Sequence, residues 1–143
     1  KEYGKMQIKE IMTPTVDYVH SDATIKQAAV KMKDLDIGVL PIVAGNKAIG
    51  IITDRDIVIR SVAQGLDPKE HQVVEAFSQD IISCRESEDI KDMAKLMEDK
   101  QIRRVIVTDD EGKLTGIVSL GDLAVKVEHE ISGEVLKEVS QPA

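Results

Sequence analysis

The chain has 143 residues, a length that suits one compact domain or two small ones sharing a core. Hydrophobic residues make up 42% and charged residues 31%, as in ordinary soluble globular proteins, whereas only 2% are aromatic. The formal charge of −7 argues against a nucleic-acid-binding surface, because phosphate backbones favour basic surfaces.

Residues able to form covalent or metal links are few and scattered. Cys84 is the single cysteine, so an intrachain disulfide and a Cys-rich metal site are excluded. The three histidines, His20, His71 and His129, show no ligand spacing, and no metal site is expected. No apolar run is long enough to span a bilayer and no signal peptide is recognisable. We therefore expect a cytoplasmic protein with no membrane partner.

The sequence repeats itself. Segment 8–13 aligns with 73–78 at an offset of 65 residues, and the same offset carries 37–43 onto 102–108. One extra residue in the next turn raises the offset to 66, at which Gly50, Thr53 and Asp56 align with Gly116, Ser119 and Asp122. A register that holds with a single insertion indicates a duplication.

Each copy predicts a strand, a helix, a hairpin of two strands and a closing helix. Apolar residues at helical spacing predict the first helix around 25–32 and around 90–97. Short apolar runs separated by turn residues predict the two hairpins. Their strands are 39–43 with 48–52, and 102–107 with 114–118.

The predicted fold class is α+β, with two tandem β-α-β-β-α repeats. The closing helices begin at Thr53 and Ser119, and Gly65 with Asp67-Pro68 ends the first of them. The expected boundaries are repeat 1 at 6–66, a linker at 67–72, repeat 2 at 73–127, and a tail at 128–143 that could carry a short helix at 134–139.

A hydroxyl and a carboxylate three residues apart end the signature that both copies share. Thr53 with Asp56, and Ser119 with Asp122, stand at a strand–helix junction beside free backbone N–H groups. A ribose diol needs a carboxylate acceptor and a phosphate needs N–H donors at a helix start, so the pattern fits a nucleotide. The structural alternative is a helix N-cap with an acid in the first turn, the commoner use of this pattern. The two interpretations are compatible.

The pattern of glycine, two apolar residues, Thr or Ser, two variable residues and Asp resembles the ribose-binding motif of CBS domains, named after cystathionine β-synthase. Segments 37–43 and 102–107 resemble the central strand of that family, and 53–60 is similar to small stand-alone bacterial and archaeal members. The resemblance covers about residues 6–126. It implies a Bateman module, a pair of repeats packed with pseudo-twofold symmetry and two ligand clefts between them.

The resemblance also assigns residues to the ligand. Asp56 and Asp122 would each hold a ribose, with Thr53 and Ser119 beside them. Segments opposite each aspartate would line the adenine. These lining residues are Ser78, Ile82 and Ile102 opposite Asp56, and Thr13, Asp17 and Ile37 opposite Asp122.

Arg103 and Arg104 are the expected phosphate ligands. They stand where a related protein, the γ subunit of the AMP-activated kinase, often carries His-Arg, whereas repeat 1 has Gly38 and Val39 there. Positive charge is therefore expected mainly in repeat 2. The alternative is a pair of exposed arginines that form weak surface ion pairs.

The sequence bears on three possible functions. The favoured one is a regulatory sensor that binds AMP, ADP, ATP or a related adenosyl ligand. The alternative is a ligand-free module of the same fold that serves dimerisation or protein interaction. An enzyme is disfavoured because the sequence shows no activated nucleophile, metal set or matched acid–base pair. We expect a homodimer with no required cofactor and no nucleic-acid partner; the sequence identifies no downstream target.

Overall fold

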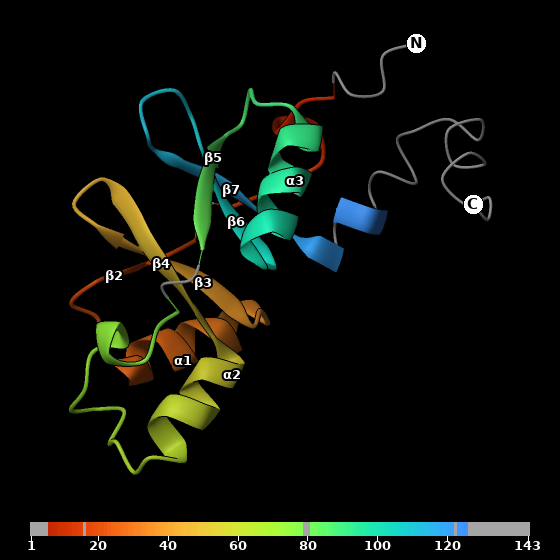
Figure 1. Ribbon diagram of the computed structural model, residues 1–143. Coiled ribbons are helices and arrows are strands. Elements are labelled where there is room, and N and C mark those ends of the chain that lie inside the picture. The colour runs from red at the N-terminus through yellow and green to blue at the C-terminus, as the bar shows by residue number, and fades with distance from the viewer. Residues whose placement is uncertain (1–5, 16, 79–80, 122, 126–143) are drawn as a thin grey trace, which may run out of the picture. The chain divides into compact units, whose positions relative to one another are not determined.

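The computed structural model describes residues 6–15, 17–78, 81–121 and 123–125. The chain divides into two compact units, each with its own sheet (Figure 1). The repeat 1 unit is Thr15–Ile81, and the repeat 2 unit is Lys1–Pro14 together with Ile82–Ala143. The predicted mixed class, with strands and helices alternating in each half, is confirmed. Asp122 and the tail with its expected short helix lie outside the described residues.

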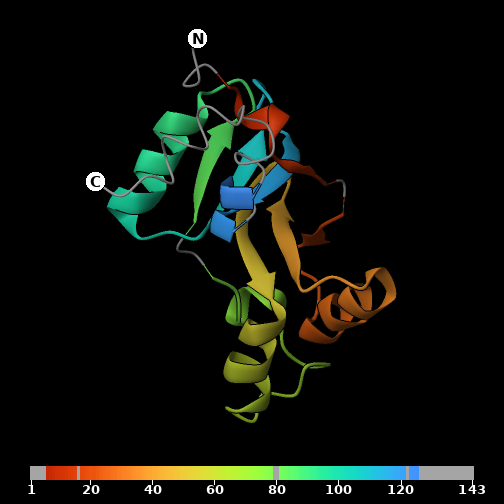
Figure 2. The same cartoon turned by 90° about the vertical axis from the view of Figure 1, so that its right-hand side faces the viewer.

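The repeat 1 unit has a three-stranded sheet in the order β2-β3-β4, in which β2 is parallel to β3 and β4 antiparallel to it. Figures 1 and 2 agree in placing α1 and α2 side by side, away from the turn that joins β3 and β4. The elements are β2 (Val19–His20), α1 (Ile25–Leu35), β3 (Val39–Ala44), β4 (Lys47–Thr53), α2 (Asp54–Ile57), the π-helical turn η3 (Val58–Val62) and the 3-10 turn η4 (Val73–Glu75).

The repeat 2 unit has a four-stranded sheet in the order β1-β7-β6-β5. Strand β5 is parallel to β6, and β7 is antiparallel to both of its neighbours. The elements are the 3-10 turn η2 (Ile8–Glu10), β1 (Thr13–Pro14), β5 (Ile82–Arg85), α3 (Ile90–Lys100), β6 (Arg104–Thr108) and β7 (Leu114–Ser119).

The long helix of each unit begins and ends as its sequence dictates. Thr24 caps α1 by accepting from the Gln27 amide at 3.0 Å, and the Asp89 side chain caps α3 by accepting from the Lys91 amide. Both helices end at a residue in the left-handed conformation, Asp36 with φ 55° and its aligned residue Gln101 with φ 57°. The helical spacing read from the sequence is confirmed, because the buried residues are Ile25, Ala28 and Met32 on α1, and Ile90, Met93 and Met97 on α3.

Strand β6 starts later than the sequence suggested. The apolar run predicted a strand from Ile102, but β6 begins at Arg104. The Ile102 amide donates instead to the Met97 carbonyl at 2.9 Å, which closes the end of α3. The left-handed residue at Gln101 turns the chain back onto the helix, so Ile102 belongs to the helix cap rather than the strand.

Each core is completed by a segment from the other repeat's sequence. We name residues 8–13 and 73–78 the lead-in segments. Ile8 and Ile11 are buried in the core of the repeat 2 unit, whereas Val73 and Ala76 are buried in the core of the repeat 1 unit. Aligned backbone bonds hold them, from the Ile8 amide to the Glu88 carbonyl at 2.9 Å and from the Val73 amide to the Ala23 carbonyl at 2.8 Å.

The signature glycines make room for the lead-in segments. A Cβ atom on Gly50 would overlap the ring of Phe77. At the aligned Gly116, a Cβ atom would lie 2.6 Å from the Met12 sulfur and 2.9 Å from the Thr13 carbonyl oxygen. Glycine is needed at both positions because backbone and a large side chain approach closely there.

Cys84 is a core residue, as its alignment with Val19 suggests. It is 3% exposed, and burial raises the pKa of its thiol to about 11. Among the described residues, no three His, Cys, Asp or Glu side chains gather in a way that could hold a metal ion. No helix in the described ranges is long and apolar enough to cross a membrane.

We predict that Gly50→Ala lowers the free energy of unfolding by about 1–3 kcal/mol, because the added methyl group must displace the rigid Phe77 ring. Gly121→Ala is the control, since nothing lies within 4 Å of a Cβ there. The control should leave stability unchanged or raise it by up to about 1 kcal/mol. Urea denaturation measures both; equal stabilities for the two variants would contradict the packing role of Gly50.

Candidate functional site

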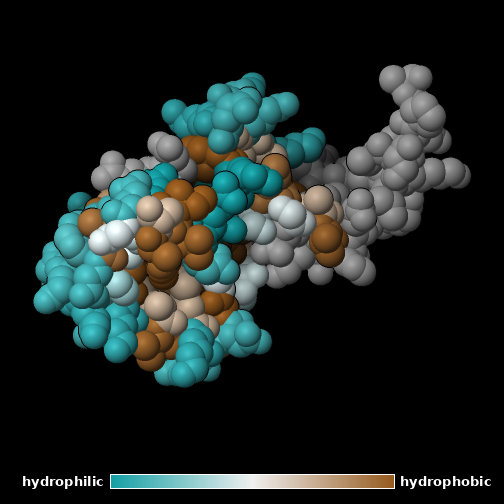
Figure 3. All heavy atoms as spheres, turned by 90° about the horizontal axis from the view of Figure 1, so that it is seen from below, coloured by the Kyte–Doolittle hydropathy of each residue, from teal (hydrophilic) through white to brown (hydrophobic). Residues whose placement is uncertain are grey.

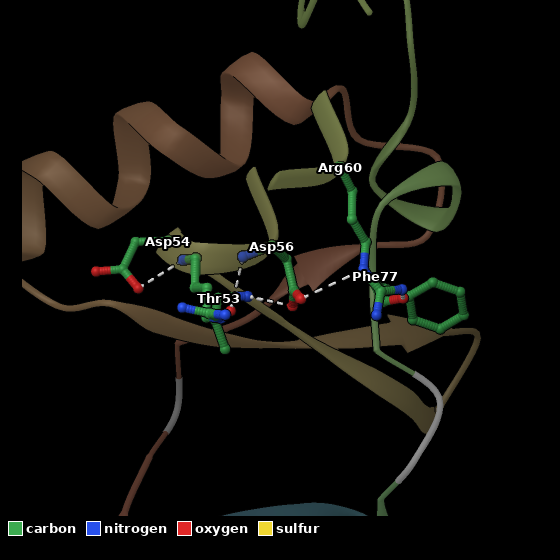
Figure 4. Close-up of polar contacts among 6 residues, drawn as sticks. Thr53, Asp54, Asp56, Arg60 and Phe77 are labelled. Carbon is green, nitrogen blue, oxygen red and sulfur yellow. Dashed lines mark hydrogen bonds and ion pairs between the residues drawn. The ribbon is translucent and has the colours of Figure 1, made fainter. Parts of the chain in front are cut away.

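The junction of β4 and α2 brings Thr53 and Asp56 together. The Thr53 hydroxyl accepts from the Asp56 amide at 3.0 Å, and Asp56 Oδ2 accepts from the Thr53 amide at 3.0 Å (Figure 4). This is a reciprocal capping box, so the structural interpretation of the motif is confirmed in repeat 1. The cap also fixes the carboxylate in one orientation.

The second oxygen of the Asp56 carboxylate is not used by the cap. Oδ1 lies 3.7 Å from Nε of Arg60, an ion pair between residues four apart on one helical turn. The Asp56 side chain is 13% exposed, and the Arg60 side chain is 50% exposed. A carboxylate held by a backbone amide on one oxygen can still accept hydrogen bonds from a diol on the other. Capping and ribose binding are therefore compatible at Asp56.

Arg60 reaches beyond the motif. Its Nη1 donates to the Phe77 carbonyl oxygen at 3.2 Å, so one guanidinium contacts both the Asp56 carboxylate and the lead-in segment (Figure 4). Its sequence position on a predicted helix indicates only a surface charge. The spacing of four residues from Asp56 was the only signal in the sequence, and the contact with Phe77 requires the fold.

A second acidic group lies beside the same junction in repeat 1. The Asp54 amide donates to the Gly38 carbonyl at 2.9 Å, and its carboxylate stands over Gly38, where a Cβ atom would lie 2.8 Å from Oδ2. The sequence-based reasoning missed Asp54. The alignment of the two repeats indicates a difference in charge at this place, because Gly38 and Asp54 of repeat 1 correspond to Arg103 and Leu120 of repeat 2.

The repeat 2 junction copies this backbone with the opposite charge. The Leu120 amide donates to the Arg103 carbonyl at 2.8 Å, and Arg104 pairs with Ser119 across β6 and β7. Both arginines are exposed, and neither forms an ion pair with any residue in the described ranges. The alternative, in which these arginines form weak surface ion pairs, therefore finds no acidic partner for them among the described residues.

A hollow of about 550 Å³ opens beside the repeat 2 junction. It lies at the C-terminal end of α3 and includes two residues that the sequence singled out, Ile102 and Arg103. Its lining residues are Ala94, Met97, Glu98, Gln101, Ile102, Arg103 and Leu120.

The remaining predicted residues divide between the two units. Ser78 lies in the same unit as Asp56, where its backbone pairs with Ile51 at 2.8 and 3.3 Å. Thr13 lies in the same unit as Ser119 and pairs with Ile117. Ser78 and Thr13 reach these places because the lead-in segments are exchanged.

The other lining residues belong to the unit that does not carry the aspartate they were assigned to. Ile82 is half-buried on β5 and, like Ile102, belongs to the repeat 2 unit. Asp17 is half-buried and Ile37 is 38% exposed, both in the repeat 1 unit. Their part in a ligand site stays a prediction, as does that of Asp122.

Two repeated α+β units, whose hairpins end at the aligned hydroxyl residues Thr53 and Ser119, define a tandem-repeat module. A model of the CBS domain matches the chain twice, at residues 8–62 and 73–129. The chain therefore belongs to the CBS-domain family, and the resemblance seen in its sequence is confirmed.

The chain matches some curated proteins over almost their whole length. YlbB of Bacillus subtilis is 36% identical over 138 residues, which cover 94% of this chain and 92% of YlbB. Hypoxic response protein 1 of Mycobacterium tuberculosis is 35% identical over 135 residues, 94% of each chain. The chain is thus similar to small proteins that consist of little beyond the two repeats.

Solved structures also share the fold. A crystal structure of Hypoxic Response Protein I with two coordinated zinc ions has a TM-score of 0.69 at 35% identity and covers 84% of this chain and 98% of its own. The CBS domain pair of protein MJ0100, in complex with 5′-methylthioadenosine and S-adenosyl-L-methionine, has a TM-score of 0.71 at 28% identity. It covers 88% of this chain and 98% of its own.

Proposed function

We propose that this chain is a regulatory module that binds an adenine nucleotide or a related adenosyl ligand and catalyses no reaction. The observation that carries the proposal is the Asp56 carboxylate, held in place through Oδ2 while Oδ1 can accept from a ribose diol. The bound adenosyl compounds of the MJ0100 pair support the ligand class. The proposed compartment is the cytoplasm, where adenine nucleotides are abundant.

The two junctions should differ in the ligand that they prefer. Asp54 places a negative charge beside the repeat 1 junction, where a phosphate would be repelled. Arg103 and Arg104 present two exposed guanidinium groups beside the repeat 2 junction, and guanidinium groups form strong charge-assisted bonds with phosphate. We assign phosphate binding to these arginines and ribose binding to Thr53, Asp56, Ser119 and Asp122. The proposed adenine-lining residues are Thr13, Asp17, Ile37, Ser78, Ile82 and Ile102.

We further propose that the protein is a homodimer joined through repeat 1. Large apolar side chains are exposed on α1 and η3, and Figure 3 shows apolar surface gathered in the middle of the face seen from below. A monomer rarely leaves such a patch uncovered. We define the helical patch as the exposed large apolar residues of α1 and η3: Val30 (43% exposed), Leu35 (40%), Val58 (57%), Ile59 (41%) and Val62 (65%).

The aligned positions in repeat 2 are less apolar, which favours repeat 1 as the contact between copies. Three of the five aligned residues are charged, and only one is a large apolar residue. A twofold dimer places the same patch of both copies together, and an apolar patch is complementary to a second copy of itself. The aligned residues are Lys95, Lys100, Ala124, Val125 and Glu128.

Ligand binding is tested by thermal shift with AMP, ADP, ATP, S-adenosylmethionine and 5′-methylthioadenosine. A ligand at 100 times its dissociation constant should stabilise the wild type by about 2.7 kcal/mol, a rise in Tm of several degrees. Asp56→Asn with Asp122→Asn should abolish the rise, because the amide retains a capping oxygen but loses the charge. Arg103→Gln with Arg104→Gln should weaken AMP binding about 10- to 100-fold and spare 5′-methylthioadenosine, which has no phosphate.

Arg85→Gln is the surface control for the arginine variant, because Arg85 pairs only loosely with Glu88, at 3.9 Å, in an exposed place. Its ligand response should equal that of the wild type. A wild type that responds to none of the five compounds would contradict nucleotide sensing and favour the ligand-free interaction module.

Dimerisation is tested by sedimentation at micromolar concentration. Val58→Lys with Val62→Lys should convert a dimer to a monomer, since two desolvated ammonium groups cannot be paired in an apolar interface. Val125→Lys, at a residue 55% exposed in repeat 2, should leave the dimer intact. A monomeric wild type, or a dimer broken by Val125→Lys alone, would contradict this placing of the interface.

A further inference from the structure

Arg60 occupies an unusual point of the backbone. It lies in the π-helical turn η3, which follows α2 directly, and the Ala63 amide donates to the Val58 carbonyl at 2.9 Å, five residues back. Such turns are rare and are found frequently at functional sites. Here the turn carries the side chain whose guanidinium contacts both Asp56 and the Phe77 carbonyl (Figure 4).

The partner of Arg60 lies close to the point where the chain leaves the repeat 1 unit. The Phe77 ring packs against Gly50, and the Ser78 amide donates to the Ile51 carbonyl at 2.8 Å. The repeat 2 unit begins four residues later, at Ile82. Phe77 and Ser78 therefore form the last described attachment of the chain to repeat 1 before it enters repeat 2.

The same guanidinium thus contacts the proposed ligand carboxylate and this attachment. We propose that Arg60 is a positioning residue that couples occupancy of Asp56 to the hold on Phe77 and Ser78. This inference rests on the proposed function. A diol that donates to Oδ1 of Asp56 shares the carboxylate charge, so the attraction on Nε of Arg60 falls. The guanidinium then leaves the Phe77 carbonyl, and the end of the lead-in segment, Phe77 and Ser78, is held less firmly.

The geometry favours arginine over lysine for this coupling. A guanidinium offers several donors in a fixed planar fork, so Nε can face Asp56 while Nη1 donates to Phe77. A lysine has a single nitrogen, so its N–H donors all leave from one point and cannot reproduce contacts made by the separate Nε and Nη1 atoms. Repeat 2 has Lys126 at the aligned position, which lies outside the described residues. The coupling is therefore assigned to repeat 1.

Amide hydrogen exchange by NMR tests the coupling at Ser78. In the ligand-free protein, both Arg60→Gln and Arg60→Lys should speed exchange of the Ser78 amide about threefold, the range expected for losing an exposed ion pair with one hydrogen bond. Saturating 5′-methylthioadenosine, which has no phosphate for Asp54 to repel, should speed it by a similar factor in the wild type and leave it unchanged in both variants. Because Arg60→Lys keeps the charge near Asp56, a purely electrostatic role would leave its exchange at the wild-type rate and overturn the inference.

Two controls separate the outcomes. The Val73 amide, bonded to the Ala23 carbonyl in the same lead-in segment, should not respond, and Arg85→Gln should leave Ser78 unaffected. A wild type that binds ligand with no change at Ser78 would overturn this inference alone. A wild type that binds none of the adenosyl compounds would overturn the proposed function and the inference together.

Discussion

In each repeat, a large side chain from a lead-in segment packs against a glycine in the last strand of the hairpin. Phe77 lies against Gly50, and Met12 lies against Gly116. Three residues beyond each glycine, the same strand ends at a hydroxyl residue, Thr53 or Ser119. The contact that completes each core therefore lies in the same strand as the junction that carries the candidate site, three residues away from it. Because protein interiors are close-packed, a change at either place is felt at the other.

The exchange of lead-in segments also makes each repeat depend on the other, because each core includes residues from the other repeat's sequence. Neither core is complete with its own repeat's sequence alone, since Ile8 and Ile11 belong to one core and Val73 and Ala76 to the other. A module of this kind can respond to a ligand only if the ligand binds one arrangement of its parts more tightly than another. In the proposed coupling, Arg60 would transmit such a difference to the chain at Phe77 and Ser78, because its guanidinium contacts the Phe77 carbonyl.

Much of the fold could be predicted from the sequence because it depends on local rules. The duplication, the apolar faces of α1 and α3, the hairpins and the cap at Thr53 all follow from spacing and residue type. The exchange could not be predicted, because Ile8 has the same local pattern whichever core receives it. The start of β6 was misplaced because the left-handed turn at Gln101 has no apolar signature.

The candidate site was predictable to a similar extent. The motif residues Thr53 and Asp56 meet as their spacing indicates, since three residues span the first turn of a helix. Arg60 and Asp54 were missed, because the contact of one with Phe77 and the approach of the other to Gly38 arise only from tertiary packing. The sequence predicts an excess of positive charge at the repeat 2 junction from Arg103 and Arg104. The structure adds a negative charge at the repeat 1 junction, that of Asp54.

The central claim is that the Asp56 and Asp122 carboxylates accept the hydroxyl groups of a ribose. Calorimetric titration of the wild type with 5′-methylthioadenosine and with its 2′,3′-dideoxy analogue tests it most directly, because the two ligands differ only in the diol and neither carries a phosphate that Asp54 would repel. The account predicts that the dideoxy compound binds about 100-fold more weakly, the loss expected for hydrogen bonds to a charged acceptor. Equal affinity for the two ligands, or binding of neither, would contradict it.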